Sequence, residues 1–287
     1  MLRRTSAAIS PTALYTGAVW RRNGLSHPAF ATRAGTAAWA GVWLPRRAAE
    51  LIGGPRLDDM LLARHHAIDT LLEQAITTGA VTQVVELAAG LSPRGWRFTS
   101  RHPDLTYVET DLPGMVRRKE EALAHTGGTT PGHRVRVVDA FATSGPDTFA
   151  ALAGELDPGQ GTAIITEGLI NYFPLPPVLA LWSTIAATLG RFTRGTYITD
   201  LHLDAHPGLA TATAKVVMGT IVRGSVYLHF EDEQAALDAL ADAGFDRAEL
   251  RLPSSFEGVE PAPGVDRNHI VQAWTAREDG PTTSGAA

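Results

Sequence analysis

The stretch QVVELAAGLSPRGW, Gln83 to Trp96, decides the fold class. A short apolar run leads directly into the small residues Ala88, Ala89 and Gly90 and then toward a helix-permissive segment. Small residues let backbone N–H groups and the end of a strand approach a ligand closely. In open parallel sheets, ligands bind at the carboxyl ends of strands, near the point where the strand order reverses. The stretch therefore predicts a strand–turn–helix unit beside a ligand site.

The same turn argues against a dinucleotide. The fingerprint G-x-G-x-x-G uses its third glycine for helix–strand packing, and Pro93 stands at that place. A nucleoside without a pyrophosphate is compatible with the turn, and so is a turn that binds no ligand.

From residue 80 onward, short apolar runs alternate with helix-permissive segments, which predicts a parallel sheet covered by helices on both faces. The last two runs are joined without a helix and predict an antiparallel hairpin at the end of the sheet. The expected strands are Gln83–Leu87, Leu105–Asp111, Arg134–Val138, Gly161–Thr166, Thr196–Leu203, Asp246–Leu252 and His269–Ala276. The expected helices among them are Pro113–His125, Asp147–Leu156, Pro177–Leu189 and Asp232–Ala243.

The region before the sheet is predicted to be helical. Apolar residues recur on one face of a helix across 57–79, with Asp58 or Asp59 expected to cap its start and Gly79 to end it. This region also contains five aromatic residues, which suit either a lid over a flat acceptor or ordinary packing of helices onto the sheet. They are Tyr15, Trp20, Phe30, Trp39 and Trp43.

One domain is predicted over residues 1–277, with a helical lid at 1–79 and an α/β core at 80–277. The small, polar residues 278–287 are expected to form a disordered tail.

Composition excludes several classes of protein. The chain has 287 residues, of which 44% are hydrophobic and 19% charged, as in ordinary globular proteins. It has no cysteine, which excludes disulfides, thiolate zinc sites, iron–sulfur clusters and a cysteine nucleophile. A net charge of −5 gives no basic field for nucleic acid or anionic membrane, and no apolar run is long enough for a membrane span. The basic start lacks the apolar core of a signal peptide, so a cytoplasmic location is expected.

Small or acidic side chains stand at the ends of four successive strands. Asp111 ends the second strand and could accept ribose hydroxyls, or cap the helix that Pro113 begins. Asp139 and Ala140 follow the third strand, where an adenine contact and a loop cap are both open. Glu167 emerges from the fourth strand into a glycine turn, where an unpaired buried carboxylate would be costly. The convergence of four such strand ends favours a ligand site.

Basic residues lie on two of the expected helices. Arg64 could clamp a carboxylate with two hydrogen bonds, although a surface ion pair with Asp69 is the simpler interpretation. The cluster Arg117, Arg118 and Lys119 is interpreted as a solvated helix face.

Five blocks, LARHHAID, VVELAAGLSPRGWRF, YVETDLPGMVRRK, VDAF and ITEGLINYF, occur in an order and spacing that resemble the leucine carboxyl methyltransferase family. They look most like its bacterial branch, which includes polyketide carboxyl O-methyltransferases of the tetracenomycin type. The resemblance covers most of the chain. It implies class I S-adenosylmethionine-dependent chemistry on a Rossmann-like, seven-stranded, mostly parallel sheet with an antiparallel end and a helical N-terminal lid.

The resemblance also implies roles in cofactor binding. Arg64 would hold the methionine carboxylate, Asp111 the ribose hydroxyls and Glu167 the polar end of the cofactor. The other cofactor-binding residues expected are Glu86, Ala88, Gly90, Asp139 and Ala140. Ala88 replaces the first glycine of the family's turn, and Ser92 replaces the aspartate that often follows it, so the contact of that acid must be absent or replaced.

Two residues are candidates for catalysis. A carboxylate acceptor needs no base, whereas a phenol, with a pKa near 10, would benefit from one. His202 and Tyr172 could position an acceptor or act as base, but a packed histidine and an aromatic filling the lid interface are the alternatives. His202 and His206, with Asp204 between them, lack a third ligand from any motif, so no metal is expected.

The sequence thus predicts an O-methyltransferase acting on a carboxyl or phenolic oxygen of a small natural product such as a polyketide. Its expected partners are S-adenosylmethionine, the product S-adenosylhomocysteine and a small acceptor, with no nucleic acid and no membrane. The alternatives are a carboxyl methyltransferase of a peptide or protein C-terminus, an oxidoreductase with a nicotinamide dinucleotide, and a nucleoside-binding protein without catalysis. Acceptor identity and oligomeric state do not follow from the sequence.

Overall fold

A seven-stranded sheet forms the centre of the computed structural model, which describes residues 11–41, 56–204 and 226–276. The strand order is β3-β2-β1-β4-β5-β7-β6, and β7 alone runs antiparallel to its neighbours. The strands are β1 Gln83–Leu87, β2 Thr106–Asp111, β3 His133–Val137, β4 Gly161–Thr166, β5 Arg194–Leu201, β6 Arg247–Arg251 and β7 His269–Ala276. The mostly parallel sheet with an antiparallel end is therefore confirmed.

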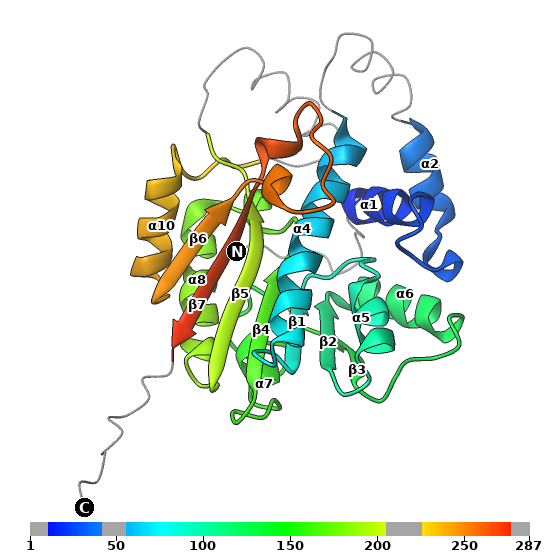
Figure 1. The fold of residues 1–287 in the computed structure, drawn as a ribbon. Helices are drawn as coiled ribbons and strands as arrows, with labels where there is room; N and C mark the ends of the chain where they lie inside the picture. The colour runs from blue at the N-terminus through cyan, green and yellow to red at the C-terminus, as the bar shows by residue number, and fades with distance from the viewer. Residues whose placement is uncertain (1–10, 42–55, 205–225, 277–287) are drawn as a thin grey trace, which may run out of the picture.

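Helices cover both faces of the sheet, with α4 in front of it and α7, α8 and α10 behind it in the view of Figure 1. The α-helices are α1 Pro11–Arg22, α2 Arg33–Gly41, α4 Leu57–Thr77, α5 Arg94–Arg101, α6 Pro113–Ala124, α7 Phe149–Ala153, α8 Leu175–Leu189 and α10 Glu233–Asp242. Short 3₁₀ turns are η1 Pro28–Phe30, η2 Ile170–Tyr172, η3 Pro253–Ser255 and η4 Val265–Arg267.

Each face of the sheet has its own apolar core. On one face, Trp182 and Ile185 of α8 pack with Leu240 of α10 against the strands. On the other, Ile68 and Leu72 of α4 pack with further buried residues of the sheet and of α5. The strands are apolar on both sides because both faces are covered, as expected of a parallel sheet.

The start of α4 differs from the prediction. Its N-cap is Arg56, which makes no side-chain cap, so the expected capping by Asp58 or Asp59 is wrong. Asp58 instead accepts hydrogen bonds from Tyr15 Oη at 2.5 Å and Trp39 Nε1 at 3.2 Å, which ties α1 and α2 to α4. The end is as predicted, because Gly79 follows α4 with a φ of +71°.

The N-terminal helices reach the turn after β1. A Cβ added at Gly17 of α1 would lie 3.1 Å from Leu91 Cβ, and one at Gly90 would lie 3.3 Å from Ala13 Cβ. Trp20 is buried and its ring centroid lies 4.8 Å from that of His65. The boundary between lid and core stays a prediction, while Trp43, His206 and the tail 278–287 lie outside the described residues.

Within the described ranges, none of the helices combines the length and the apolar character that crossing a bilayer would require.

Candidate functional site

The turn after β1 lies at the topological switch of the sheet, where β1 pairs with β2 on one side and β4 on the other. Ala88 and Gly90 both have a φ of +54°, and Ala88 is the one non-glycine residue of the described segments with a positive φ. This left-handed conformation costs an alanine about 1–2 kcal/mol. Such strain is found at ligand sites, where the surrounding structure imposes it.

Asp111, at the end of β2, holds this turn in place. Its carboxylate accepts hydrogen bonds from the backbone N–H groups of Gly90 at 2.8 Å and Leu112 at 2.7 Å. The N-cap of α6 is Leu112, so the alternative in which Asp111 is the cap residue is wrong. Burial raises the pKa of Asp111 above its ordinary value, although these two backbone bonds act in the opposite direction. Its role toward a ribose stays a prediction.

Arg64 of α4 lies buried beside the turn that follows β4. Its Nε donates to Glu167 Oε1 and its Nη1 to Asp200 Oδ2, each at 3.1 Å. The glycine turn makes room for it, because a Cβ at Gly168, whose φ is +65°, would lie 3.2 Å from both terminal guanidinium nitrogens. A surface ion pair between Arg64 and Asp69 is therefore wrong. Burial lowers the pKa of Arg64, but Asp200 and Glu167 more than reverse this.

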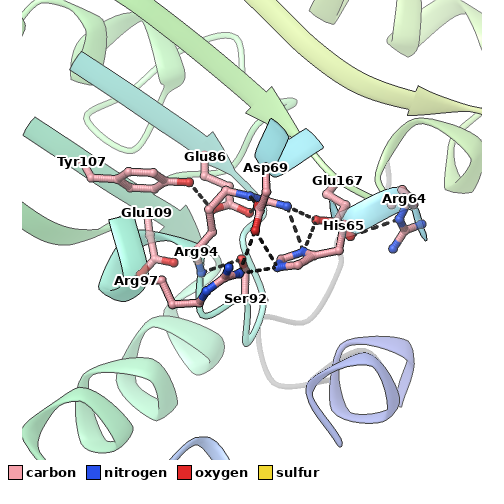
Figure 2. Close-up of polar contacts among 12 residues, drawn as sticks. Arg64, His65, Asp69, Glu86, Ser92, Arg94, Arg97, Tyr107, Glu109 and Glu167 are labelled. Carbon is pink, nitrogen blue, oxygen red and sulfur yellow. Dashed lines mark hydrogen bonds and ion pairs between the residues drawn. The ribbon is translucent and has the colours of Figure 1, made fainter. Parts of the chain in front are cut away.

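Arg94, the first residue of α5, is the centre of a buried ionic network that the sequence interpretation missed (Figure 2). Its guanidinium is fully buried and donates to three carboxylates, which come from α4, from β1 and from the turn after β4. The acceptors are Asp69 Oδ1 at 2.6 Å, Glu86 Oε1 at 2.6 Å and Glu167 Oε2 at 2.5 Å. The sequence did contain a signal for the burial of Arg94, since this residue belongs to the stretch 83–96 that decides the fold. A buried arginine four residues after the Ala88–Gly90 turn needs carboxylate partners.

Glu86 of β1 lies beneath the turn. Its second oxygen accepts a hydrogen bond from Tyr107 Oη at 2.6 Å, so the carboxylate is engaged by Tyr107 and Arg94. Burial raises the pKa of Glu86 despite the charge of Arg94. The structure thus places Glu86 as a support of the turn, and its direct contact with a cofactor stays a prediction.

Glu167, which directly follows β4, joins Arg64 and Arg94. Burial would raise its pKa, but His65, Arg94 and Arg64 hold the pKa well below its ordinary value. His65 Nδ1 lies 2.9 Å from Glu167 Oε2. The expectation that this carboxylate must be paired or functional is met by pairing.

The network joins charged side chains from several parts of the chain. Three arginines are in ion-pair contact with four carboxylates, and its members are Arg64, Arg94, Arg97, Asp69, Glu86, Glu167 and Asp200. Each of these carboxylates has an arginine partner, as the burial of charged groups requires.

A second buried ion pair corrects the interpretation of α6 for Lys119, whereas Arg117 is exposed as predicted. Lys119 is only 2% exposed, and its Nζ donates to Glu109 Oε1 at 2.6 Å. Glu109 Oε2 also lies 2.7 Å from His133 Nε2. Lys119 is thus part of the core rather than a solvated face, because α6 packs against β2 and β3.

The third strand ends in a loop apart from this network. Asp139 is exposed and its Oδ1 accepts a hydrogen bond from Phe141 N at 3.0 Å, so it does act as a loop cap. Ala140 is partly buried, and the rings of Phe141 and Phe173 lie 3.9 Å apart between centroids. An adenine contact by Asp139 and Ala140 stays a prediction.

A hollow that is open to solvent has Arg64 in its wall. Both catalytic candidates, Tyr172 and His202, line it together with Asp200. Asn171 shapes its wall: its Oδ1 accepts from His202 N at 3.0 Å, and its Nδ2 donates to Tyr227 O at 2.6 Å. Burial lowers the pKa of His202 to about 4 and raises that of Tyr172. The structure thus places Tyr172 and His202 at one hollow, while their catalytic roles stay predictions.

Comparison with known proteins agrees with this fold. A family model described as leucine carboxyl methyltransferase matches residues 29–186, more than half of the chain. Two curated relatives share the name "Putative S-adenosyl-L-methionine-dependent methyltransferase". One, from Mycolicibacterium gilvum, is 36% identical over 43% of this chain and 39% of its own length. The other, from Mycobacterium sp. strain JLS, is 29% identical over 81% of this chain and 64% of its own length.

The matched region thus spans less than two thirds of either curated relative. Among solved structures, the crystal structure of "a putative methyltransferase" from Thermobifida fusca superposes with a TM-score of 0.64 at 13% identity, covering 95% of this chain and 97% of that chain. This likeness shows the fold. The names of the curated relatives agree with the cofactor that the sequence predicts.

Proposed function

The chain belongs to the leucine carboxyl methyltransferase family, and from this premise we propose that it transfers a methyl group from S-adenosylmethionine to a carboxyl or phenolic oxygen of a small natural product, such as a polyketide. A cytoplasmic location and a small-molecule partner belong to the same proposal.

One observation supports this proposal most: the strained turn at Ala88 and Gly90 lies at the carboxyl edge of the sheet, where Asp111 accepts a hydrogen bond from Gly90 N. When bound, S-adenosylmethionine supplies an electrophilic methyl group on a positively charged sulfur. Arg64 has guanidinium N–H groups beyond the two engaged by Glu167 and Asp200, and these suit a carboxylate. Asp111 presents carboxylate oxygens to hydroxyl groups beside the turn.

The contribution of the chain to such a reaction is alignment and exclusion of water. The network fixes Glu167 from two sides, through Arg64 and Arg94, so its orientation is set before a ligand arrives. The helix α1 packs on the turn and shields it.

The oxidoreductase alternative fits less well. Pro93 is the N-cap of α5 and occupies the place of the glycine that a dinucleotide fingerprint needs, which disfavours a nicotinamide oxidoreductase. A peptide or protein C-terminus stays an alternative acceptor, because Asp200, which lines the hollow, is paired with Arg64.

Calorimetric titration of the purified chain with S-adenosylhomocysteine, with NAD as the control ligand, tests the proposal. We expect saturable binding of S-adenosylhomocysteine alone. Binding of NAD instead, or of neither ligand, would overturn it.

A further inference from the structure

Two side chains that line the hollow have buried hydrogen-bonding atoms without a partner in the described part of the chain. These atoms are the two ring nitrogens of His202 and the Oδ1 atom of Asn268, and none of the three has a hydrogen-bond partner among the described residues. Both residues line the same hollow, and both follow or flank strands, His202 after β5 and Asn268 before β7. A buried polar atom left without a partner costs about 1–3 kcal/mol, so these atoms indicate a ligand that bonds to them.

The chemistry of these atoms selects the ligand. A neutral imidazole offers one N–H donor and one acceptor nitrogen, and an amide oxygen offers only acceptor sites. Two of the three unused atoms therefore need a hydrogen-bond donor from the ligand. An ionised carboxylate has no donor, whereas a hydroxyl group has one.

The charges around His202 point the same way. The groups that act on it are Asp200 of β5, Arg64 of α4, His269 of β7 and Arg267 of η4. Arg64 is already paired with Glu167 and Asp200, so its positive charge is balanced. The imidazole is neutral above about pH 4, so it adds no positive charge for an anion near neutral pH.

Apolar side chains also line the hollow, among them Leu57, Met60 and Leu61 of α4. A flat aromatic skeleton that carries a hydroxyl group matches this mixed lining, because the ring would cover apolar surface while the hydroxyl reaches a polar group.

We propose, on the basis of the proposed function, that the methyl acceptor is an uncharged hydroxylated aromatic compound rather than a carboxylate, and that its O–H group donates to His202. As the oxygen–methyl bond forms, the sulfur–methyl bond breaks and its electron pair stays on sulfur, which becomes a neutral thioether. The hydroxyl proton passes to the free nitrogen of His202 and from there to water. Asp200 faces the imidazolium that forms.

The test uses a matched pair of probes, 2-naphthol and 2-naphthoic acid, which share a skeleton and differ in the reacting group. Each is titrated at pH 7.5 into the whole chain saturated with S-adenosylhomocysteine, and binding is followed by calorimetry and by saturation-transfer NMR. The variants are His202→Phe, which keeps a ring without nitrogen, and Asn268→Leu. His125→Phe is the control, because His125 is exposed at the end of α6 and does not line the hollow.

We expect 2-naphthol to bind at least 10-fold more tightly than 2-naphthoic acid. We also expect His202→Phe to weaken 2-naphthol binding at least 10-fold while leaving the affinity for S-adenosylhomocysteine unchanged, and His125→Phe to change neither. Tighter binding of the acid, no detectable binding of 2-naphthol at millimolar concentration, or unchanged 2-naphthol binding in both site variants would overturn the inference. If His202→Phe does not fold, His202→Gln and Asn268→Leu supply the same comparison.

The two proposals fail in different ways. Loss of S-adenosylhomocysteine binding by the unaltered chain would refute the proposed function, and this inference with it. Retained S-adenosylhomocysteine binding with a preference for the acid would refute only this inference.

Discussion

Removing the charge at the centre of the buried network should have a large and measurable effect on stability. Arg94→Met keeps much of the side-chain length but leaves Asp69, Glu86 and Glu167 without the cation that they share. Deleting one partner of a buried ion pair typically costs about 3–5 kcal/mol. Because Asp69 and Glu167 keep other cationic partners, we expect a cost of about 3 kcal/mol, at the lower end of that range.

The matched control is Arg136→Met, which removes an arginine whose ion pair with Glu155 has both side chains 47% exposed. Exposed pairs contribute about 0–1 kcal/mol, so this variant should unfold close to the wild type. Urea denaturation followed by circular dichroism at pH 7 measures both variants through the midpoint and slope. A loss below about 1 kcal/mol for Arg94→Met, equal to that of the control, would refute the role given to the network.

The pH dependence provides a second check on the same variant. The pKa values of Asp69 and Glu167 lie below their ordinary values in the folded chain, for which Arg94 is one cause. They contribute stability that is present above about pH 4 and is lost as the pH falls through their folded pKa values. The difference between wild type and Arg94→Met should therefore narrow below about pH 4. Adding Glu86→Gln to Arg94→Met should recover part of the stability, since burial already raises the pKa of Glu86.

Four further predictions follow from single contacts. Asp111→Ala should weaken S-adenosylhomocysteine binding by at least about 1 kcal/mol in calorimetry, because it removes the acceptor that fixes Gly90; unchanged affinity would remove Asp111 from the site. Tyr172→Phe should keep that affinity and lower turnover once an acceptor is in hand, and equal turnover would return Tyr172 to packing. The pKa of His202 is lowered to about 4 in the folded chain, so its contribution to the free energy of unfolding is lost as the pH falls below about 6.5. Between pH 7 and pH 4 the free energy of unfolding of the wild type, measured by urea titration, should fall by about 3 kcal/mol more than that of His202→Phe. Parallel pH dependences of the two proteins would contradict this. Gly95→Ala should lower the free energy of unfolding by about 1–3 kcal/mol, because a Cβ there would lie 2.7 Å from Glu109 Cδ and His133 Nε2, and an unaltered midpoint would contradict that packing.

Local patterns in the sequence were sufficient for the sheet. Strands β1, β4 and β7 have the predicted bounds, and the others begin or end within two residues of them. Apolar runs and turn residues are local properties of the chain, so the alternation of strands and helices is visible in the sequence. The meeting of Glu167, Asp111 and the Ala88–Gly90 turn at one edge followed from the same alternation, because parallel strands end on the same side.

Charged residues gave the poorest predictions, and for a common reason. Lys119 and Arg94 are hydrophilic in any sequence pattern, and a pattern gives no information on whether a carboxylate from another element lies nearby. Asp69 and Glu86 reach Arg94 from 25 and 8 residues away along the chain, and Glu167 from 73. Such charges can be buried only when several partners come together at once. Here the packing of α4 and α5 against the sheet brings these partners together.

The sequence by itself determined the order of strands and helices, the turn at the carboxyl edge and the family, since each depends on residues that are neighbours along the chain. Tertiary structure alone decided which charges are buried and that Arg64 pairs with Glu167 and Asp200. It also decided that His202 and Asn268 line one hollow with hydrogen-bonding atoms that have no partner within residues 11–41, 56–204 and 226–276. The physical reason is that the free energy of a buried polar group depends on the atoms within a few ångströms of it, and folding brings those atoms from distant parts of the chain.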